Sequence, residues 1–226
     1  MSPDDSGTTS TDGPFAGKRA RMVERQLRRR GITDERVLAA MEEVPRERFV
    51  PERERGRAYR DGALRIGEGQ TISQPWIVAC MAQALELRGH ERALEVGAGS
   101  GYSAAVLSRL CAEVVAIERF PSLARAAAER LSELGYGNVE VREGDGTLGA
   151  PDRAPFQGIA VTAAATGEPP PALFDQLAPG GTLVCPVVRD GREVLVRVRD
   201  GEEEVLASVR FVPLVAGEGP GDGSDR

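Results

Sequence analysis

Three glycines, Gly97, Gly99 and Gly101, stand at alternate positions between two apolar stretches of the chain. Glycine lets the backbone approach a ligand closely, and a glycine-rich turn between a strand and a helix can hold a nucleotide-like ligand. The spacing is G-x-G-x-G, and Tyr102 occupies the place where a dinucleotide-binding loop carries its last glycine. The sequence therefore predicts a nucleotide-like cofactor that is not a dinucleotide.

Acidic residues accompany this loop and the two apolar stretches that follow it. Glu95 lies just before the glycines and Glu118 ends the next stretch. Asp145 ends the third stretch, beside Gly146. The Glu118 carboxylate can accept hydrogen bonds from both hydroxyls of a ribose, and Asp145 can reach an adenine amino group while Gly146 leaves room for the ring. Each acid alone is equally consistent with an exposed turn, but three in register at successive strand ends favour a cofactor site.

The short glycine pattern, with Glu95 ahead of it, resembles the first motif of class I S-adenosylmethionine methyltransferases. A glycine loop alone is a weak signal, and the acids placed after it strengthen the assignment. The resemblance implies S-adenosyl-L-methionine as the cofactor. The cofactor-binding residues would then be Glu95, Gly97, Gly99, Ser100, Gly101, Tyr102, Glu118, Asp145 and Gly146.

Two other segments are more specific than the glycine loop. Residues 67–78 read Gly-Glu-Gly-Gln-Thr-Ile-Ser-Gln-Pro-Trp-Ile-Val, and residues 211–214 read Phe-Val-Pro-Leu. With shorter strings at 44–46, 49–51 and 58–61, they resemble the protein-L-isoaspartate (D-aspartate) O-methyltransferase family. The resemblance runs in order from about Met22 to Gly217.

That family transfers a methyl group to the free carboxylate of L-isoaspartyl or D-aspartyl residues in damaged proteins. The ester then closes to a succinimide without further help from the enzyme. The resemblance implies that isoaspartyl peptides and proteins are the partners and that Ser73 is the active-site residue. It places the substrate-binding residues at Gln70, Thr71, Ile72, Val212, Pro213 and Leu214.

Methylation of a carboxylate does not require the catalytic residue types that this chain lacks. His90 is its one histidine and precedes the first predicted strand, so no Ser-His-Asp triad can form. A carboxylate with a pKa of about 4 is already an ionised nucleophile at neutral pH. We therefore expect the Ser73 hydroxyl to hold the carboxylate through a hydrogen bond rather than to attack. An alternative role for Ser73, compatible with the first, is to cap the helix that begins at Pro75.

The chain departs from the family pattern at several places, of which two concern the argument below. Residues 61–67 lack two prolines that the family carries there, and Gln157 stands where the family has an aspartate. These changes bear on substrate preference more than on cofactor binding. They leave open a peptide aspartate O-methyltransferase dedicated to natural-product maturation, or an inactive regulatory module that binds the cofactor. A small-molecule methyltransferase fits less well, because the 211–214 segment suits an extended peptide.

Strand and helix patterns alternate from Arg92 onward, which predicts an α/β fold with a parallel sheet covered on both faces. We expect a Rossmann-like class I methyltransferase with a mostly parallel seven-stranded sheet, a helical N-terminal extension and a late antiparallel strand. The predicted strands are 93–96, 113–117, 139–142, 158–162, 181–188, 194–198 and 204–209, and the predicted core helices are 102–111, 122–134 and 171–177.

The sequence predicts one methyltransferase domain at residues 17–216. Its helical part and substrate loop would occupy 17–91, with a long loop at 52–74, and its cofactor-binding core 92–216. The Ser-, Gly- and Asp-rich residues 1–16 should form a disordered arm, and 217–226 a flexible tail.

Composition limits the other classes of function. The formal net charge of -6 argues against a nucleic-acid surface, which needs a basic footprint. No apolar run approaches the roughly 20 residues of a membrane span, and no signal segment is visible, so we expect a cytoplasmic monomer without a membrane partner. The three cysteines, Cys80, Cys111 and Cys185, form no CxxC pair, which predicts buried thiols and no metal site.

Overall fold

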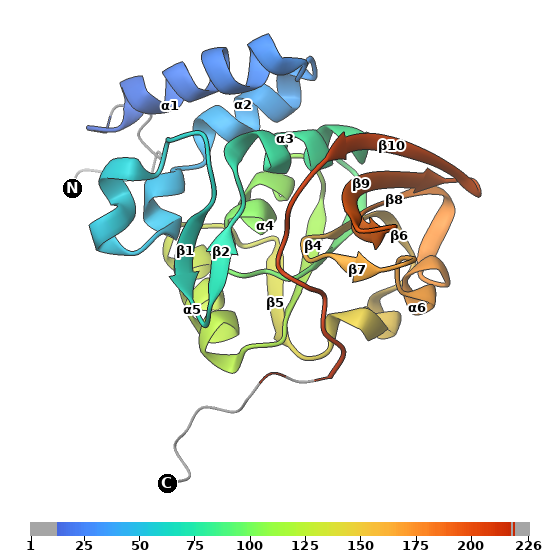
Figure 1. The fold of residues 1–226 in the computed structure, drawn as a ribbon. Coiled ribbons are helices and arrows are strands. Elements are labelled where there is room, and N and C mark those ends of the chain that lie inside the picture. Colours follow the sequence, from blue (N-terminus) through green and yellow to red (C-terminus); the bar gives the residue numbers. More distant parts are fainter. Residues whose placement is uncertain (1–12, 218, 220–226) are drawn as a thin grey trace, which may run out of the picture.

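A mostly parallel sheet organises residues 13–217 and 219, the part of the chain that the computed structural model describes (Figure 1). Its strands follow the order β10-β9-β8-β6-β3-β4-β5, and β7 pairs with β8 beside this path. The strands are β3 (Arg92–Val96), β4 (Glu113–Glu118), β5 (Val139–Glu143), β6 (Phe156–Val161), β7 (Ala165–Thr166), β8 (Leu177–Arg189), β9 (Arg192–Arg199) and β10 (Glu202–Ser208). The predicted fold class is confirmed, with the two-residue β7 added to the seven expected strands.

The order of the strands creates a place for a ligand. The chain passes from β3 outward through β4 to β5 and then returns to β6 on the other side of β3, all in parallel. In open α/β sheets, ligands bind outside the carboxyl ends of the strands at such a reversal. At the far side, β9 pairs antiparallel with both β8 and β10, so β9 is the one late antiparallel strand that was expected.

Side chains of the central strands alternate between two hydrophobic clusters, because successive residues of a strand point to opposite faces. Ala93 and Val114 pack in the larger cluster with the N-terminal helices. Leu94 and Val115 pack in the other, together with Leu173 of α6 (Pro171–Phe174). Burial on both faces explains why these strands are continuous apolar runs rather than alternating ones.

The larger cluster is covered by the helices of the N-terminal part and of the first half of the core (Figure 1). A continuous helical stretch runs from α1 (Ala16–Met22) through η1 (Val23–Leu27) and η2 (Arg28–Arg30) to Gly31, whose φ of +90° ends it. The remaining α-helices on this side are α2 (Glu35–Glu43), α3 (Pro75–Ala84), α4 (Tyr102–Leu107) and α5 (Pro121–Glu133). Asp34 caps α2 by accepting hydrogen bonds from the backbone of Arg36 and Val37.

The prediction of a long loop at 52–74 is wrong. This segment contains the 3-10 helix η4 (Glu52–Arg57) and an antiparallel hairpin of β1 (Leu64–Gly67) and β2 (Gln70–Ile72). The buried Leu64 and Ile72 face each other across the hairpin, whose tip turns at positive φ through Gly67–Gly69. Strands this short, with a glycine-rich tip, leave too little alternation for the sequence to reveal them.

Several boundaries also differ from expectation. The helix predicted at 102–111 ends at Leu107, and that predicted at 171–177 ends at Phe174 because Leu177 already begins β8. Further 3-10 turns are η3 (Arg46–Phe49), η5 (Gly146–Leu148) and η6 (Pro151–Arg153).

The chain ends are only partly covered. Residues 1–12 of the predicted arm, and 218 and 220–226 of the predicted tail, lie outside the described residues. Among the described residues near the two ends, the Phe15 ring packs 6.3 Å from that of Tyr59, and Gly217 and Gly219 both donate backbone hydrogen bonds to the core. Among the helices of residues 13–217, none is long and apolar enough to cross a bilayer.

Candidate active site

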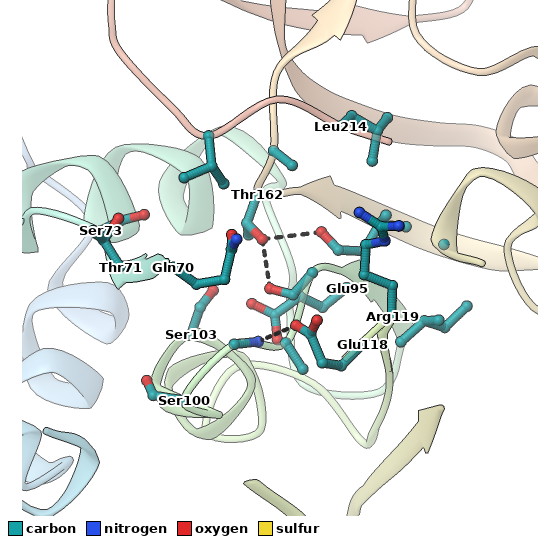
Figure 2. Close-up of a pocket in the computed structure, with 18 of the residues that line it drawn as sticks. Gln70, Thr71, Ser73, Glu95, Ser100, Ser103, Glu118, Arg119, Thr162 and Leu214 are labelled. Carbon is teal, nitrogen blue, oxygen red and sulfur yellow. Dashed lines mark hydrogen bonds between the residues drawn. The ribbon is translucent and has the colours of Figure 1, made fainter. Parts of the chain in front are cut away.

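A cavity opens at the carboxyl ends of β3, β4 and β6, where the strand order reverses (Figure 2). Fourteen of the sixteen predicted site residues line it, and they come from the hairpin, the glycine loop, two strand ends and the C-terminal segment. These are Gln70, Thr71, Ile72, Ser73, Glu95, Gly97, Gly99, Ser100, Tyr102, Glu118, Gly146, Val212, Pro213 and Leu214. Gly101 and Asp145 do not line the cavity.

The glycine loop is held in place by a residue that the sequence reading missed. Thr162, directly after β6, donates through Oγ1 to the carbonyl oxygen of Gly97 at 2.6 Å (Figure 2). A Cβ on Gly97 would meet that Oγ1 at 2.5 Å, and its φ is +95°, so only glycine fits. Gly101 packs beneath the cavity, where a Cβ would lie 3.1 Å from Leu131 of α5. A polar residue ending the strand predicted at 158–162 was the available signal for Thr162.

Glu118 is a fixed carboxylate at the end of β4. Its Oε2 accepts a hydrogen bond from the Gly99 backbone at 2.7 Å, and its Oε1 accepts one from the Phe120 backbone at 3.0 Å. The side chain therefore ties the glycine loop to the next strand end, as Figure 2 shows. Each oxygen retains a lone pair that can accept from a ligand hydroxyl.

Glu95 is a fully buried acid whose two oxygens accept no hydrogen bond of normal geometry in the described part of the chain, although the Ser103 side chain and the Ala104 backbone are near enough to act on its pKa. Burial raises its pKa to about 8, with Glu118 adding to the rise and the side chain of Ser103 opposing it. Ser103 also lines the cavity and was not predicted. Because an unpartnered buried carboxyl is costly, Glu95 calls for a cationic or donor group from a ligand.

Asp145 does not line the cavity, and its carboxylate already has protein donors. Its Oδ1 accepts from the backbone and hydroxyl of Thr147, within the 3-10 turn that Asp145 caps, and its Oδ2 accepts from the Gly217 backbone at 2.6 Å. Burial opposes ionisation of Asp145, but these hydrogen bonds outweigh it and lower the pKa. The carboxylate therefore holds the C-terminal segment in this structure rather than facing the cavity. Its neighbour Gly146 does line the cavity, and a Cβ there would come within 2.5 Å of Val96.

Ser73 lies between β2 and α3, on the opposite side of the cavity from Glu118 (Figure 2). The residue that caps α3 is Gln74 and it forms no side-chain cap bond, so the alternative of Ser73 as a helix cap is wrong. The Ser73 carbonyl oxygen accepts a hydrogen bond from the fully buried Arg46 at 2.7 Å. Its backbone is thus anchored, and its hydroxyl has no partner among the described residues.

The C-terminal segment forms one wall of the cavity. After β10 the chain returns toward the hairpin side of the molecule (Figure 1), and Val212 to Leu214 pair with Ala164 just beyond β6. Ala164 donates to the Val212 carbonyl at 2.8 Å, and Leu214 donates to the Ala164 carbonyl at 2.7 Å. The cavity is therefore enclosed between a fixed backbone segment and the β1–β2 hairpin.

Other candidate chemistries find no support in the described residues. The His90 side chain is 82% exposed and is not part of the cavity lining. Cys111 and Cys185 are buried and Cys80 partly buried, and no cluster of His, Cys, Asp or Glu within residues 13–217 could hold a metal ion. What the cavity offers is a glycine cradle, two acids on one side and a hydroxyl on the other.

The family model for protein-L-isoaspartate(D-aspartate) O-methyltransferase matches residues 18–219. The chain belongs to this family. A relative with the printed name protein-L-isoaspartate O-methyltransferase 2, from Anaeromyxobacter sp. (strain Fw109-5), is 56% identical over 205 residues, 88% of this chain and 84% of its own. The protein-L-isoaspartate O-methyltransferase of Pelotomaculum thermopropionicum is 53% identical over 218 residues, covering 94% and 95%.

Solved structures with the same kind of name share the fold. One protein-L-isoaspartate O-methyltransferase superposes with a TM-score of 0.76 at 29% identity; the match covers 86% of this chain and 65% of that one, so this chain spans slightly less than two thirds of it. A beta-aspartate methyltransferase from Plasmodium falciparum, solved in complex with S-adenosyl-L-homocysteine, gives 0.76 at 27% identity, covering 87% and 98%.

The departures from the isoaspartate methyltransferase pattern now have places in the structure. Gln157 lies at the amino end of β6, away from the cavity, where its Oε1 accepts from the Arg92 backbone at 2.8 Å. Residues 64–67 form β1, and Ile66 packs near Gly99, where a Cβ would lie 3.3 Å from it. The loss of two prolines in this family member is therefore accompanied by an ordered hairpin against the cofactor loop, and no observation favours the natural-product or regulatory alternatives.

Proposed function

We propose that the protein transfers the methyl group of S-adenosyl-L-methionine to the free carboxylate of L-isoaspartyl or D-aspartyl residues in damaged proteins, which initiates their repair through a succinimide. The observation that carries the proposal is the cavity itself. It joins a glycine cradle with buried acids to the unpartnered hydroxyl of Ser73 across one enclosed space. Family membership and the names of the relatives support the same reaction.

The cavity suits S-adenosyl-L-methionine. Its sulfonium supplies an electrophilic methyl group with a neutral leaving group. Glu118, held by two backbone donors, is placed to accept hydrogen bonds from the ribose hydroxyls. The unpartnered carboxyl of Glu95 is suited to the ammonium of the methionine part, which would supply the partner it lacks. Gly97 and Gly99 let the backbone come close to the cofactor.

Ser73 orients the second reactant. The substrate carboxylate is ionised at neutral pH, so no base is needed to activate it. The Ser73 hydroxyl donates a hydrogen bond to one carboxylate oxygen and leaves the other directed at the methyl carbon. Ile72 and Leu214 exclude water from the line of attack, which favours an aligned displacement. The product ester leaves the enzyme, and the backbone nitrogen of the following residue then attacks the ester carbonyl, which closes the succinimide and releases methanol.

The proposal also covers the binding partners, the cellular compartment and the oligomeric state. The net charge of -6 supports a protein that binds isoaspartyl polypeptides and not nucleic acid. We further propose that it works in the cytoplasm as a monomer, because the cavity is complete within one chain.

One assay tests the proposal. Isoaspartyl and aspartyl versions of one peptide are incubated with S-adenosyl-L-methionine, and methanol from ester breakdown is measured for wild type, Ser73→Ala and the surface control Ser132→Ala. We expect transfer to the isoaspartyl version alone, a loss of about 10- to 100-fold for Ser73→Ala with cofactor affinity retained, and no change for the control. Folded, cofactor-binding protein that methylates neither peptide would overturn the proposal.

A further inference from the structure

A groove continues from the cavity on its substrate side. Thr71, Ser73, Thr162 and Val212 line both spaces, so the groove begins at the proposed site of methyl transfer. From there it runs between the start of α3 on one wall and the segment after β10 on the other. An extended peptide advances about 3.3 Å per residue, so a side chain one or two residues from the reacting carboxylate falls within this groove.

Aromatic side chains stand on both walls. Trp76, in the first turn of α3, and Phe211, after β10, both line the groove and both are partly exposed. Ile77 and Val209 add aliphatic surface, and Gln74 and Ser208 add polar side chains to the same lining. The groove therefore combines polar and apolar surface, and the two aromatic rings are its largest apolar side chains.

Trp76 is fixed before any ligand arrives. Its indole Nε1 donates to the Arg30 carbonyl oxygen at 3.1 Å, and the Arg30 guanidinium stacks 5.1 Å from the ring centroid. Arg30 is held in turn by both oxygens of Asp61 at 3.1 Å, and Gln74 also donates to Asp61. A pre-ordered ring loses little entropy on binding, which makes it an effective anchor for a side chain.

The charges around the groove do not compete with this role. Arg30 is neutralised by Asp61, and the Glu193 carboxylate accepts from the Phe211 backbone. Arg210 is exposed on the rim and has no acidic partner among the described residues. One unpaired cation at the rim disfavours a basic side chain, and the paired charges leave the aromatic wall as the main contact surface.

We propose that this groove binds the side chain next to the isoaspartyl residue and that Trp76 selects a large apolar residue there, aromatic above all. The inference rests on the proposed function and specifies its substrate class: isoaspartyl sites flanked by aromatic or bulky aliphatic residues are methylated first. Trp76 acts on specificity and takes no part in the transfer itself.

The test is a panel of isoaspartyl peptides that differ only in the residues one and two positions before and after the isoaspartyl residue: Phe, Leu, Ala, Asp or Lys. We expect kcat/KM for the best Phe peptide to exceed that for Ala by about tenfold, mostly through KM, with Lys lowest. Trp76→Ala should reduce this ratio to near one, and Trp76→Phe should retain part of it.

Two controls separate the outcomes. Phe174→Ala removes an exposed aromatic from α6, outside both cavities, and should leave the ratio unchanged. A merely structural role of Trp76 would lower kcat/KM for all peptides equally, and melting temperatures identify unfolded variants. Equal rates for all flanks, a preference for Asp, or a Phe preference that survives Trp76→Ala in a folded variant would overturn the inference and leave the proposed function intact. Absence of methylation of any peptide would instead count against the proposed function.

Discussion

Arg46 donates a hydrogen bond from Nη2 to the carbonyl oxygen of Ser73 at 2.7 Å, although its guanidinium is completely buried. The same side chain donates from Nε to the Ala58 carbonyl at 2.8 Å and stacks 4.7 Å from the ring centroid of Tyr102. It has no carboxylate partner among the described residues, and burial lowers its pKa. One cation thus joins the substrate-side residue Ser73 to the helix that follows the cofactor loop.

Replacing Arg46 should affect the substrate side more than the cofactor side. Arg46→Met leaves two buried carbonyls without a donor, so we expect a loss of about 2–4 kcal/mol in the free energy of unfolding, measured with urea. In the protein that remains folded, KM for an isoaspartyl peptide should rise more than Kd for S-adenosyl-L-homocysteine. Arg109→Met, which removes a guanidinium stacked on Tyr136, serves as control. Equal losses on both sides would mean that Arg46 does not position Ser73.

The raised pKa of Glu95 predicts how stability depends on pH. The folded protein holds this proton up to about pH 8, whereas an unfolded glutamic acid loses it near 4.5. The protonated Glu95 therefore contributes its full stability below the unfolded pKa of 4.5. This contribution is lost as the pH rises through the folded pKa of about 8. Glu95→Gln mimics the protonated form, so the cofactor-free variant should match wild type near pH 4–5 and exceed it near pH 9. Denaturant titrations across this range measure the difference, and a parallel offset at every pH would contradict the assignment.

Glu95 also predicts how cofactor binding depends on pH. Binding an ammonium group favours the ionised carboxylate, so the affinity for S-adenosyl-L-homocysteine should rise as the pH increases through about 8. The slope should disappear in Glu95→Gln, which should also bind more weakly at high pH. Calorimetry in buffers of different ionisation enthalpy would detect the proton released. A slope that persists in the variant would assign the titration to another group.

Replacing Thr162 should lower the affinity for the cofactor and leave the rest of the fold unchanged. Thr162→Val keeps the shape of the side chain but removes the donor to Gly97, so cofactor affinity should fall about 5- to 10-fold with little change in fold. Thr182→Val, at a buried threonine of β8 outside the cavity, is the matched control and should bind normally. Fluorescence or calorimetric titration with S-adenosyl-L-homocysteine makes the comparison. Equal affinities would show that the loop holds its shape without Thr162.

The sequence could predict the parts of the site that depend on local pattern. The glycines and Glu118 were found because parallel strands bring their carboxyl ends together, so residues at successive strand ends meet. Arg46 and Thr162 were missed as supports because each acts on a backbone carbonyl far away in sequence, which no residue pattern records. The contact between Asp145 and Gly217 could not be predicted, because Gly217 belongs to a segment whose composition is typical of a flexible tail.

The central claim is that the methyl group goes to the carboxylate of an isoaspartyl residue. Mass spectrometry of a peptide carrying one isoaspartyl residue, incubated with the wild-type protein and S-adenosyl-L-methionine, tests it most directly. The account predicts one added methyl group on that residue, then a succinimide, and then a growing fraction of normal aspartyl peptide, with methylation about 10- to 100-fold slower for Ser73→Ala. Methylation at any other position, or an unchanged peptide in the presence of folded protein with bound cofactor, would contradict it.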